Sequence, residues 1–289
     1  MGRPLVTPDQ LLLLWTQDEV RVVCRRPSGL EHHPDLAMRI RGALGRQLAV
    51  AGAPVAGRFD PFGRQGAFDL LYSQSRGPES SGEQARPMAI DADVVGEHVI
   101  VEARLFGRAG FWIEQVRDGL LAALQNGVSL RLGGKTHVSF EILDCLQRRF
   151  VPEIPIKTGR EAVLAFRTPV RVRAGERTRR DPLAILWSAV TRVRGLAAWQ
   201  EAELVLDELQ LRAEAARLTF DDEDLTPMNF RRHSIRQGNV AIPVSGSIGK
   251  LVARGRLEGL TPFLTLGQYT HIGSHAALGF GRYDLAIYV

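Results

Sequence analysis

Cysteine and long apolar runs are scarce in this chain of 289 residues. Its two cysteines, Cys24 and Cys145, form no Cys-x-x-Cys motif and have no spacing typical of zinc ligands, so we expect neither a metal site nor another cofactor. The apolar run Leu11–Trp15 is too short to span a bilayer. It also lacks the basic flank and cleavage site of a signal peptide. We therefore expect a protein of the reducing cytoplasm, without a membrane partner.

Lysine is also rare, since it occurs only at Lys135, Lys157 and Lys250, and 34 of the 37 basic residues are arginine. The net charge of +5 is modest and does not establish nucleic-acid binding by itself. Arginine, however, offers a planar fork that matches phosphate and stacks on bases. The bias favours RNA as a ligand, although a genome rich in G and C would produce the same excess.

The first half of the chain predicts the order β-α-β-β-α-β. Its expected strands have alternating or β-branched apolar residues, and its expected helices have apolar residues three or four positions apart. The stretch 73–87, rich in Gly, Ser and Pro, is expected to be an exposed loop. The strands are expected at 19–26, 68–72, 99–105 and 138–142, and the helices at 36–48 and 113–124. This order is that of a ferredoxin-like fold, an antiparallel sheet backed by two helices.

The segment Phe150–Pro155 carries two prolines and predicts a boundary between one domain at residues 1–150 and a second at 156–289. The second domain is expected to repeat the same order in an elaborated form, with a helical insertion at about 181–206. Its other elements are expected to be strands at 162–166, 214–220, 240–244, 251–257 and 283–289, and a short helix at 261–266. We therefore predict an α+β protein of two tandem ferredoxin-like (RRM-like) domains.

Three glycines, Gly273, Gly279 and Gly281, stand in a Gly-x5-Gly-x-Gly pattern between that short helix and the last strand. Glycine adopts positive φ readily and lets a ligand approach the main chain closely. The pattern predicts a loop at 273–281 whose amides contact a large anion, and the arginine-rich composition favours RNA as that anion. A tight turn that serves folding alone is the alternative.

Several further segments, spread over most of the chain, carry a resemblance to a known family. They are Arg41–Gly45, Arg86–Pro87, Ala103–Ala109, Phe166–Pro169, Arg232–Gln237, Ile242–Gly249 and, as the strongest match, His271–Tyr283. Together they resemble the CRISPR-associated endoribonucleases that process precursor CRISPR RNA, a branch of the RAMP (repeat-associated mysterious protein) superfamily.

The resemblance implies metal-independent cleavage of CRISPR repeat RNA, with the crRNA stem-loop and other CRISPR effector subunits as partners. In that reaction the ribose 2′-hydroxyl attacks the adjacent phosphate, which leaves a 2′,3′-cyclic phosphate and a 5′-hydroxyl. A non-catalytic RAMP subunit that binds crRNA in an effector complex is the alternative function. An RNA-binding protein of RRM type is a weaker interpretation, since the aromatic RNP pattern is absent and aromatic residues make up only 7% of the chain.

Family members often place a catalytic histidine after the first strand or on the first helix, which points here to His32 and His33. A histidine exchanges a proton near neutral pH without extreme tuning. No tyrosine accompanies these histidines, as one does in some relatives, and other branches work mainly with arginine. Arg39 and Arg41 on the first helix are therefore further catalytic candidates. Exposed loop histidines and a solvated helix edge are the interpretations without a function.

The basic segments predict where RNA binds. The segment around His233 is expected to grip the phosphates of a repeat stem, and the run Arg171–Arg180 with the helix after it is expected to contact a stem-loop through phosphates and 2′-hydroxyls. A solvated linker followed by a core helix is the alternative for that run. The predicted RNA-binding residues are Arg25, Arg26, Arg46, Arg179, Arg180, Arg192, Arg194, Arg231, Arg232, His233, Arg236, Gly273, His275, Gly279, Gly281 and Arg282.

Overall fold

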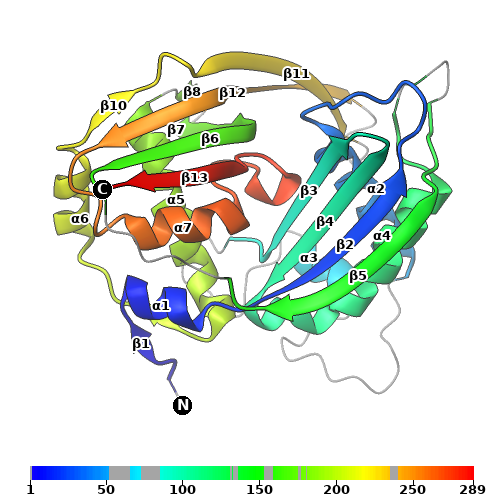
Figure 1. Ribbon diagram of the computed structural model, residues 1–289. Coiled ribbons are helices and arrows are strands. Elements are labelled where there is room, and N and C mark those ends of the chain that lie inside the picture. Colours follow the sequence, from blue (N-terminus) through cyan, green and yellow to red (C-terminus); the bar gives the residue numbers. More distant parts are fainter. Residues whose placement is uncertain are drawn as a thin grey trace.

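The computed structural model describes residues 2–51, 66–72, 85–130, 132, 136–152, 159–174, 177–179, 181–234 and 240–289. Two antiparallel sheets stand side by side, each with helices packed against it (Figure 1). This arrangement confirms the predicted α+β class. Within the described ranges, no helix combines the length and the apolar character that crossing a membrane requires.

The first half of the chain folds into a four-stranded sheet backed by helices. Its elements are β2 (Gln17–Arg25), α2 (Leu36–Val50), α3 (Ala67–Leu71), β3 (Met88–Val95), β4 (His98–Phe106), η1 (Gly107–Trp112), α4 (Ile113–Asn126) and β5 (Ile142–Phe150). The strands lie in the order β3-β4-β2-β5, with every neighbouring pair antiparallel. Val20, Val22 and Cys24 of β2 are completely buried, because alternate side chains of a strand share one face. On α2, every fourth residue from Leu36 to Leu48 is buried, so this helix and α4 pack together over the sheet.

The second half builds a five-stranded sheet with its own helices. Its elements are β6 (Glu161–Val170), β7 (Val172–Ala174), β8 (Arg177–Arg179), α5 (Pro182–Ala197), η2 (Ala198–Gln200), β9 (Glu203–Leu204), α6 (Glu208–Ala215), β10 (Thr219–Asp221), β11 (Thr226–Ser234), β12 (Val240–Arg254), α7 (Thr261–Thr270), η4 (Ala276–Leu278) and β13 (Tyr283–Tyr288). The sheet order is β10-β12-β6-β13, and β11 pairs with β12. The first residues of the chain join this half, since β1 (Leu5–Val6) pairs with β9 and α1 (Pro8–Leu14) packs against α7.

Two strands predicted for the first half are wrong. Residues 68–72 belong to helix α3 and its C-cap, where Phe68 and Tyr72, one helical turn apart, stack with their ring centroids 5.5 Å apart. The strand that occupies this place in the sheet is β3, which the pattern did not predict. The last strand begins at Ile142, and Val138 forms only an isolated bridge with Val128. Most of the loop predicted at 73–87 lies outside the described residues.

The second half also differs from its prediction. The predicted insertion is a core helix, α5, which ends at Ala197, packs against α7, and is followed by η2 and the short strand β9. The segment 214–220 holds the end of α6 and the start of β10 instead of one strand. The two strands predicted at 240–244 and 251–257 are parts of the single strand β12, whose register shifts between Ser247 and Gly249. Because residues 153–158 are not described, the domain boundary stays a prediction.

Hydrogen bonds join the two halves at several places. Gln200 of η2 exchanges two bonds of 3.0 Å with the main chain of Thr16, which precedes β2. Arg192 of α5 donates to the carbonyl of Met88 on β3 at 3.1 Å and to that of Thr270 at 3.1 Å. Burial and the neighbouring Arg86 lower the pKa of Arg192 to about 9. The guanidinium of Arg192 is therefore part of the interface between the halves.

Candidate active site

The connection between β2 and α2 places an exposed histidine on a buried carboxylate. The side chain of His33 is 58% exposed, whereas that of Asp35 is only 3% exposed, and His33 Nδ1 contacts Asp35 Oδ1. His32 is exposed and has no hydrogen bond or ion pair with the described part of the chain. The structure thus separates the two predicted histidines, because only His33 has a fixed partner.

Two side chains hold the Asp35 carboxylate in place, His33 at one oxygen and Arg39 at the other. Its second carboxylate oxygen accepts a hydrogen bond of 2.6 Å from Arg39 Nε, one helical turn further along α2. Arg39 Nη1 donates in turn to the carbonyl of Ser129 at 3.1 Å. The carboxylate is therefore oriented before any ligand arrives, and a guanidinium that is 30% exposed stands beside it.

This geometry determines which nitrogen of His33 faces outward. The main-chain amide of Asp35 lies 3.3 Å from His33 Nδ1, but the carboxylate oxygen is closer to the same nitrogen. An ionised carboxylate can only accept hydrogen bonds, so Nδ1 carries the proton and donates a hydrogen bond to Asp35. Nε2 is then the nitrogen left to accept or return a proton, which is the arrangement of a histidine held by a carboxylate in acid–base catalysis.

Arg41, the other predicted catalytic arginine, lies in the core. It is 4% exposed, its Nη2 donates to the carbonyl of Leu71 at 3.0 Å, and its Cζ lies 4.1 Å from the centroid of the Tyr72 ring. Burial raises the pKa of Tyr72 to about 12, so its hydroxyl stays protonated and donates to the Arg41 carbonyl at 2.8 Å. In this arrangement Arg41 anchors α3 to α2, and it does not reach a ligand at the surface.

The glycine-rich loop has the positive φ angles that its sequence predicts. The φ angles are +78° at Gly273, +89° at Gly279 and +68° at Gly281. Two of the three amides are already occupied, since Gly279 donates to the carbonyl of Ala276 at 3.0 Å and Gly281 donates to that of Pro169 at 3.0 Å. The amides of residues 272, 274, 278, 280 and 282 also donate within the protein. The loop is therefore built mainly by its own hydrogen bonds, and the amides of Gly279 and Gly281 are not free to hold a phosphate.

The same loop lies against the first turn of α2. A Cβ added at Gly279 would lie 2.7 Å from the Cβ of Ala37 and 2.9 Å from the carbonyl oxygen of Ile90 on β3. Only a glycine permits this approach. Ala37 is two residues beyond Asp35 and four beyond His33. The structure thus brings together two candidate sites that are about 240 positions apart in the sequence, as Figure 1 shows in the red segment before β13 that faces β3.

Most predicted RNA-binding arginines of the first half and of α5 have partners within the protein. Arg25 pairs with Glu141 at 2.8 Å, and Arg26 donates to the carbonyls of Leu30 and Gly96. Arg192 is buried as described above, and Arg194, half exposed, pairs with Glu208. Arg46 is partly exposed on α2 and has no ion pair within the described ranges. Among these residues, the structure leaves Arg46 best placed to meet a ligand.

The remaining predicted residues fall into two groups. Arg282 pairs with Asp93, and the ring of His275 packs edge-on against Phe280 with centroids 5.9 Å apart. The other group is placed only in its backbone or not at all: Arg179, Arg231, Arg232 and His233 lie on β8 and β11 without described side chains, and Arg180 and Arg236 lie outside the described residues. Their roles stay predictions.

Asp35 was not singled out from the sequence as a functional residue, although the spacing His33-Pro34-Asp35 was a usable signal. Among the residues that the structure describes, no group of three or more His, Cys, Asp and Glu side chains is placed to hold a metal ion.

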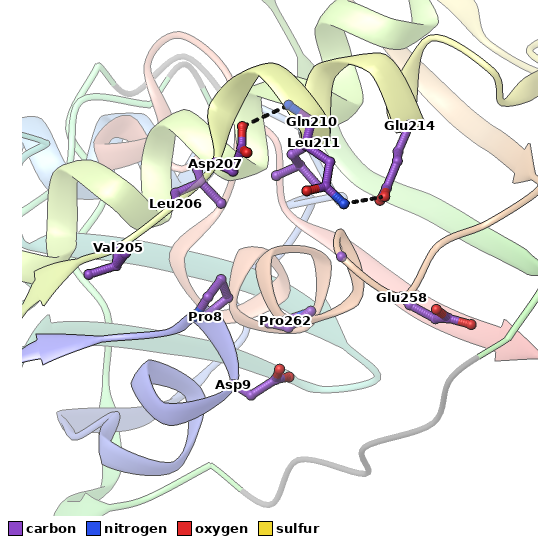
Figure 2. A pocket seen from close by; sticks show the side chains of 11 residues that line it. Pro8, Asp9, Val205, Leu206, Asp207, Gln210, Leu211, Glu214, Glu258 and Pro262 are labelled. Atoms are coloured by element: carbon purple, nitrogen blue, oxygen red, sulfur yellow. Dashed lines mark hydrogen bonds between the residues drawn. The ribbon is translucent and has the colours of Figure 1, made fainter.

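A groove elsewhere on the molecule has no relation to these residues. It lies between α1, α6 and the start of α7, and Figure 2 shows the carboxylates of Asp9, Asp207, Glu214 and Glu258 around it. An acidic lining repels phosphate. This groove is therefore not the place where we expect RNA to bind.

Comparison with known proteins places the fold and the loop. The family model of the CRISPR-associated endoribonuclease Cas6 matches residues 164–283, from the middle of β6 to the start of β13. No curated protein sequence matches the chain. A Cas6 (TTHA0078) product complex is similar in structure, with a TM-score of 0.56, 17% identity, and coverage of 94% of this chain and 99% of that one.

Two further solved structures have a similar fold. Thermus thermophilus Cas6 (TTHB231) has a TM-score of 0.56 at 11% identity, and covers 94% of this chain and 99% of its own. A structure described as "An RAMP protein binding different RNA substrates" has a TM-score of 0.50 at 14% identity, with coverage of 94% and 99%. At these identities the similarity shows a shared fold over nearly the whole chain.

The α+β fold is shared with these structures over nearly the whole chain, and the Cas6 family model covers the glycine loop before the last strand. Residues 164–283, which include that loop, are therefore similar to the CRISPR-associated endoribonuclease Cas6, and the fold of nearly the whole chain is similar to that of Cas6 structures. The match does not include the first turn of α2, where His33, Asp35 and Arg39 meet.

Proposed function

We propose that this protein is a metal-independent endoribonuclease that cleaves CRISPR repeat RNA into mature crRNA and retains the product stem-loop. The observation that carries the proposal is the His33–Asp35 pair beside the glycine loop of a Cas6-family second half. We further propose that the two halves are tandem ferredoxin-like domains, which the sheet orders β3-β4-β2-β5 and β10-β12-β6-β13 support.

The proposed chemistry needs a proton carrier and a nearby cation. The 2′-oxygen forms a bond to phosphorus while the bond from phosphorus to the 5′-oxygen breaks, which gives a 2′,3′-cyclic phosphate and a 5′-hydroxyl. His33, oriented by Asp35, either accepts the 2′-hydroxyl proton or protonates the 5′-oxygen, and one histidine in this role contributes about 10²–10⁴-fold to the rate. Arg39 stands beside the same carboxylate, and its remaining guanidinium donors would stabilise the negative charge of the pentacoordinate phosphate.

RNA binding is the second part of the proposal. A-form stems are contacted mainly at phosphates and 2′-hydroxyls. Arg46 on α2, together with the basic segments that contain Arg179–Arg180 and Arg231–Arg236, would supply the positive surface for these contacts. One structural neighbour is a product complex, another is described as binding different RNA substrates, and a third belongs to a partial Cas6-RT-Cas1--Cas2 complex. By analogy we propose repeat RNA and other CRISPR proteins as partners, in the cytoplasm.

Incubation of end-labelled repeat RNA with the purified protein in EDTA tests the function. A single cut at the base of the repeat stem is expected. Tight binding without a cut would instead support a non-catalytic RAMP subunit, an alternative favoured by the restriction of the family match to residues 164–283. Equal treatment of repeat RNA and an unrelated hairpin would refute both functions.

A further inference from the structure

A buried group of charged side chains ties both ends of the glycine loop to the first sheet. Asp91 on β3 is 2% exposed, and its Oδ1 lies 3.0 Å from Nε2 of His271, which is completely buried. The same oxygen lies 3.5 Å from Nε of Arg282. His271 lies two residues before the glycine loop 273–281, and Arg282 directly follows it. One carboxylate of the first half therefore faces both residues that bracket the loop of the second half.

The carboxylate is fixed from its own side as well. Arg104 on β4 donates from Nη1 to Asp91 Oδ2 at 2.7 Å, and its Nε donates to Glu19 on β2 at 2.9 Å. Arg282 makes a further bond of 2.5 Å to Asp93. The contact between Asp91 and His271 is at ion-pair distance, although its alignment is not that of a regular hydrogen bond. Asp91 thus has a rigid position on the sheet from which it contacts the loop.

The backbone of His271 shows that its ring is needed here. Its φ of +59° and ψ of +163° lie in a region that is essentially restricted to glycine, and a histidine there is strained. A glycine would remove the strain. In the protein, the histidine ring offsets this backbone strain by contacting Asp91 through Nε2. Its Nδ1 lies 3.3 Å from the carbonyl oxygen of Ala276 within the loop. The strained residue therefore connects the loop to the first half.

The glycine loop connects the contact with Asp91 to the candidate active site. Its tip at Gly279 presses on Ala37 in the first turn of α2, and that turn carries Asp35, which orients His33. We propose that Asp91, His271 and Arg282, which we call the loop anchor, are positioning residues that hold the glycine loop over the first turn of α2 and so keep the His33–Asp35 pair in its reactive orientation. The inference rests on the proposed function for its catalytic part only.

Two variants and one matched control test the anchor. His271→Gly removes the ring while it relieves the backbone strain, so this variant is expected to fold, and Asp91→Asn removes the charge with little change of shape. The control is Gln200→Ala, which deletes three hydrogen bonds between the halves at Thr16, at a place that does not contact the glycine loop. Amide hydrogen exchange is measured on each protein without RNA. Single-turnover cleavage of repeat RNA is measured at saturating enzyme, where the rate does not depend on affinity.

Both anchor variants are expected to exchange faster in the loop and in the first turn of α2, and to cleave about tenfold to a hundredfold more slowly. The control is expected to exchange faster only around Thr16 and η2, with an unchanged cleavage rate. Unchanged exchange in the first turn of α2 would overturn the proposal, and so would faster exchange with a wild-type cleavage rate. If the wild-type protein cuts no repeat RNA, the proposed function fails, while the exchange data still decide whether the anchor holds this turn.

Discussion

The contact between the glycine loop and α2 gives a quantitative prediction at Gly279. In Gly279→Ala, the new methyl group would lie 2.7 Å from the Cβ of Ala37 and 2.9 Å from the carbonyl oxygen of Ile90. Neither neighbour is the end of a flexible side chain, so helix or strand must shift, which costs about 1–3 kcal/mol. An alanine at φ +89° adds strain of about 1–2 kcal/mol. The expected loss of stability is about 2–5 kcal/mol.

Gly96, in the turn between β3 and β4, provides the matched control. Its φ is +56°, and an added Cβ would meet nothing within 4 Å. Gly96→Ala therefore carries the backbone strain without the collision. Urea unfolding of both variants, followed by circular dichroism and compared at equal m-values, should show Gly279→Ala to be less stable by about 1–3 kcal/mol. Equal stability of the two variants would refute the close packing of the loop on α2.

Four other substitutions test the same geometry. His33→Ala should slow single-turnover cleavage by about a hundredfold or more with unchanged RNA binding, whereas His32→Ala should cleave like the wild type. Equal losses of rate in the two variants would contradict the assignment of the proton transfer to His33 alone. Arg41→Ala should lower the free energy of unfolding in urea by about 2–4 kcal/mol, because it loses a buried hydrogen bond and its contact with Tyr72. A cleavage defect at unchanged stability would instead make Arg41 a catalytic candidate again. Burial would raise the pKa of Asp91, but His271, Arg104 and Arg282 outweigh it and hold this pKa well below its usual range. The stabilisation by Asp91 is therefore complete above about pH 4 and lost as the pH falls further, so the stability gap between wild type and Asp91→Asn should shrink below that pH, and a constant gap would contradict the ion pair.

Periodicity predicted the elements whose side chains have one buried and one exposed face. α2 begins at the predicted Leu36, and α4 begins at the predicted Ile113, because both present regular apolar stripes to the sheet. The sequence pattern did not predict β3, because this strand is buried on both faces. Its Ile90 and Ala92 are buried on one face, but Asp91 is buried on the other, beneath the second half of the chain. A carboxylate that reads as solvent-exposed in the sequence is covered by residues nearly 200 positions away.

The candidate site shows the same limit. The resemblance to a family that often places a catalytic histidine after the first strand was enough to predict His33, together with His32, as a catalytic candidate. The spacing His33-Pro34-Asp35 distinguishes His33 from His32, but only the fold shows that the Asp35 carboxylate contacts the His33 ring. The glycine loop was predicted as an RNA-binding loop from its pattern. The positive φ angles agree with the pattern, but the amides of Gly279 and Gly281 bond within the protein, and only the fold shows that Gly279 serves a contact with Ala37.

We propose that this chain cleaves repeat RNA through the 2′-hydroxyl, without a metal, at the start of α2. The most direct measurement compares repeat RNA with the same RNA carrying one 2′-deoxy nucleotide just upstream of the cut, both in EDTA. We predict a 2′,3′-cyclic phosphate and a 5′-hydroxyl from the first RNA, and binding without cleavage for the second. Cleavage of the 2′-deoxy RNA, or a cut that appears only after a divalent metal is added, would contradict the account.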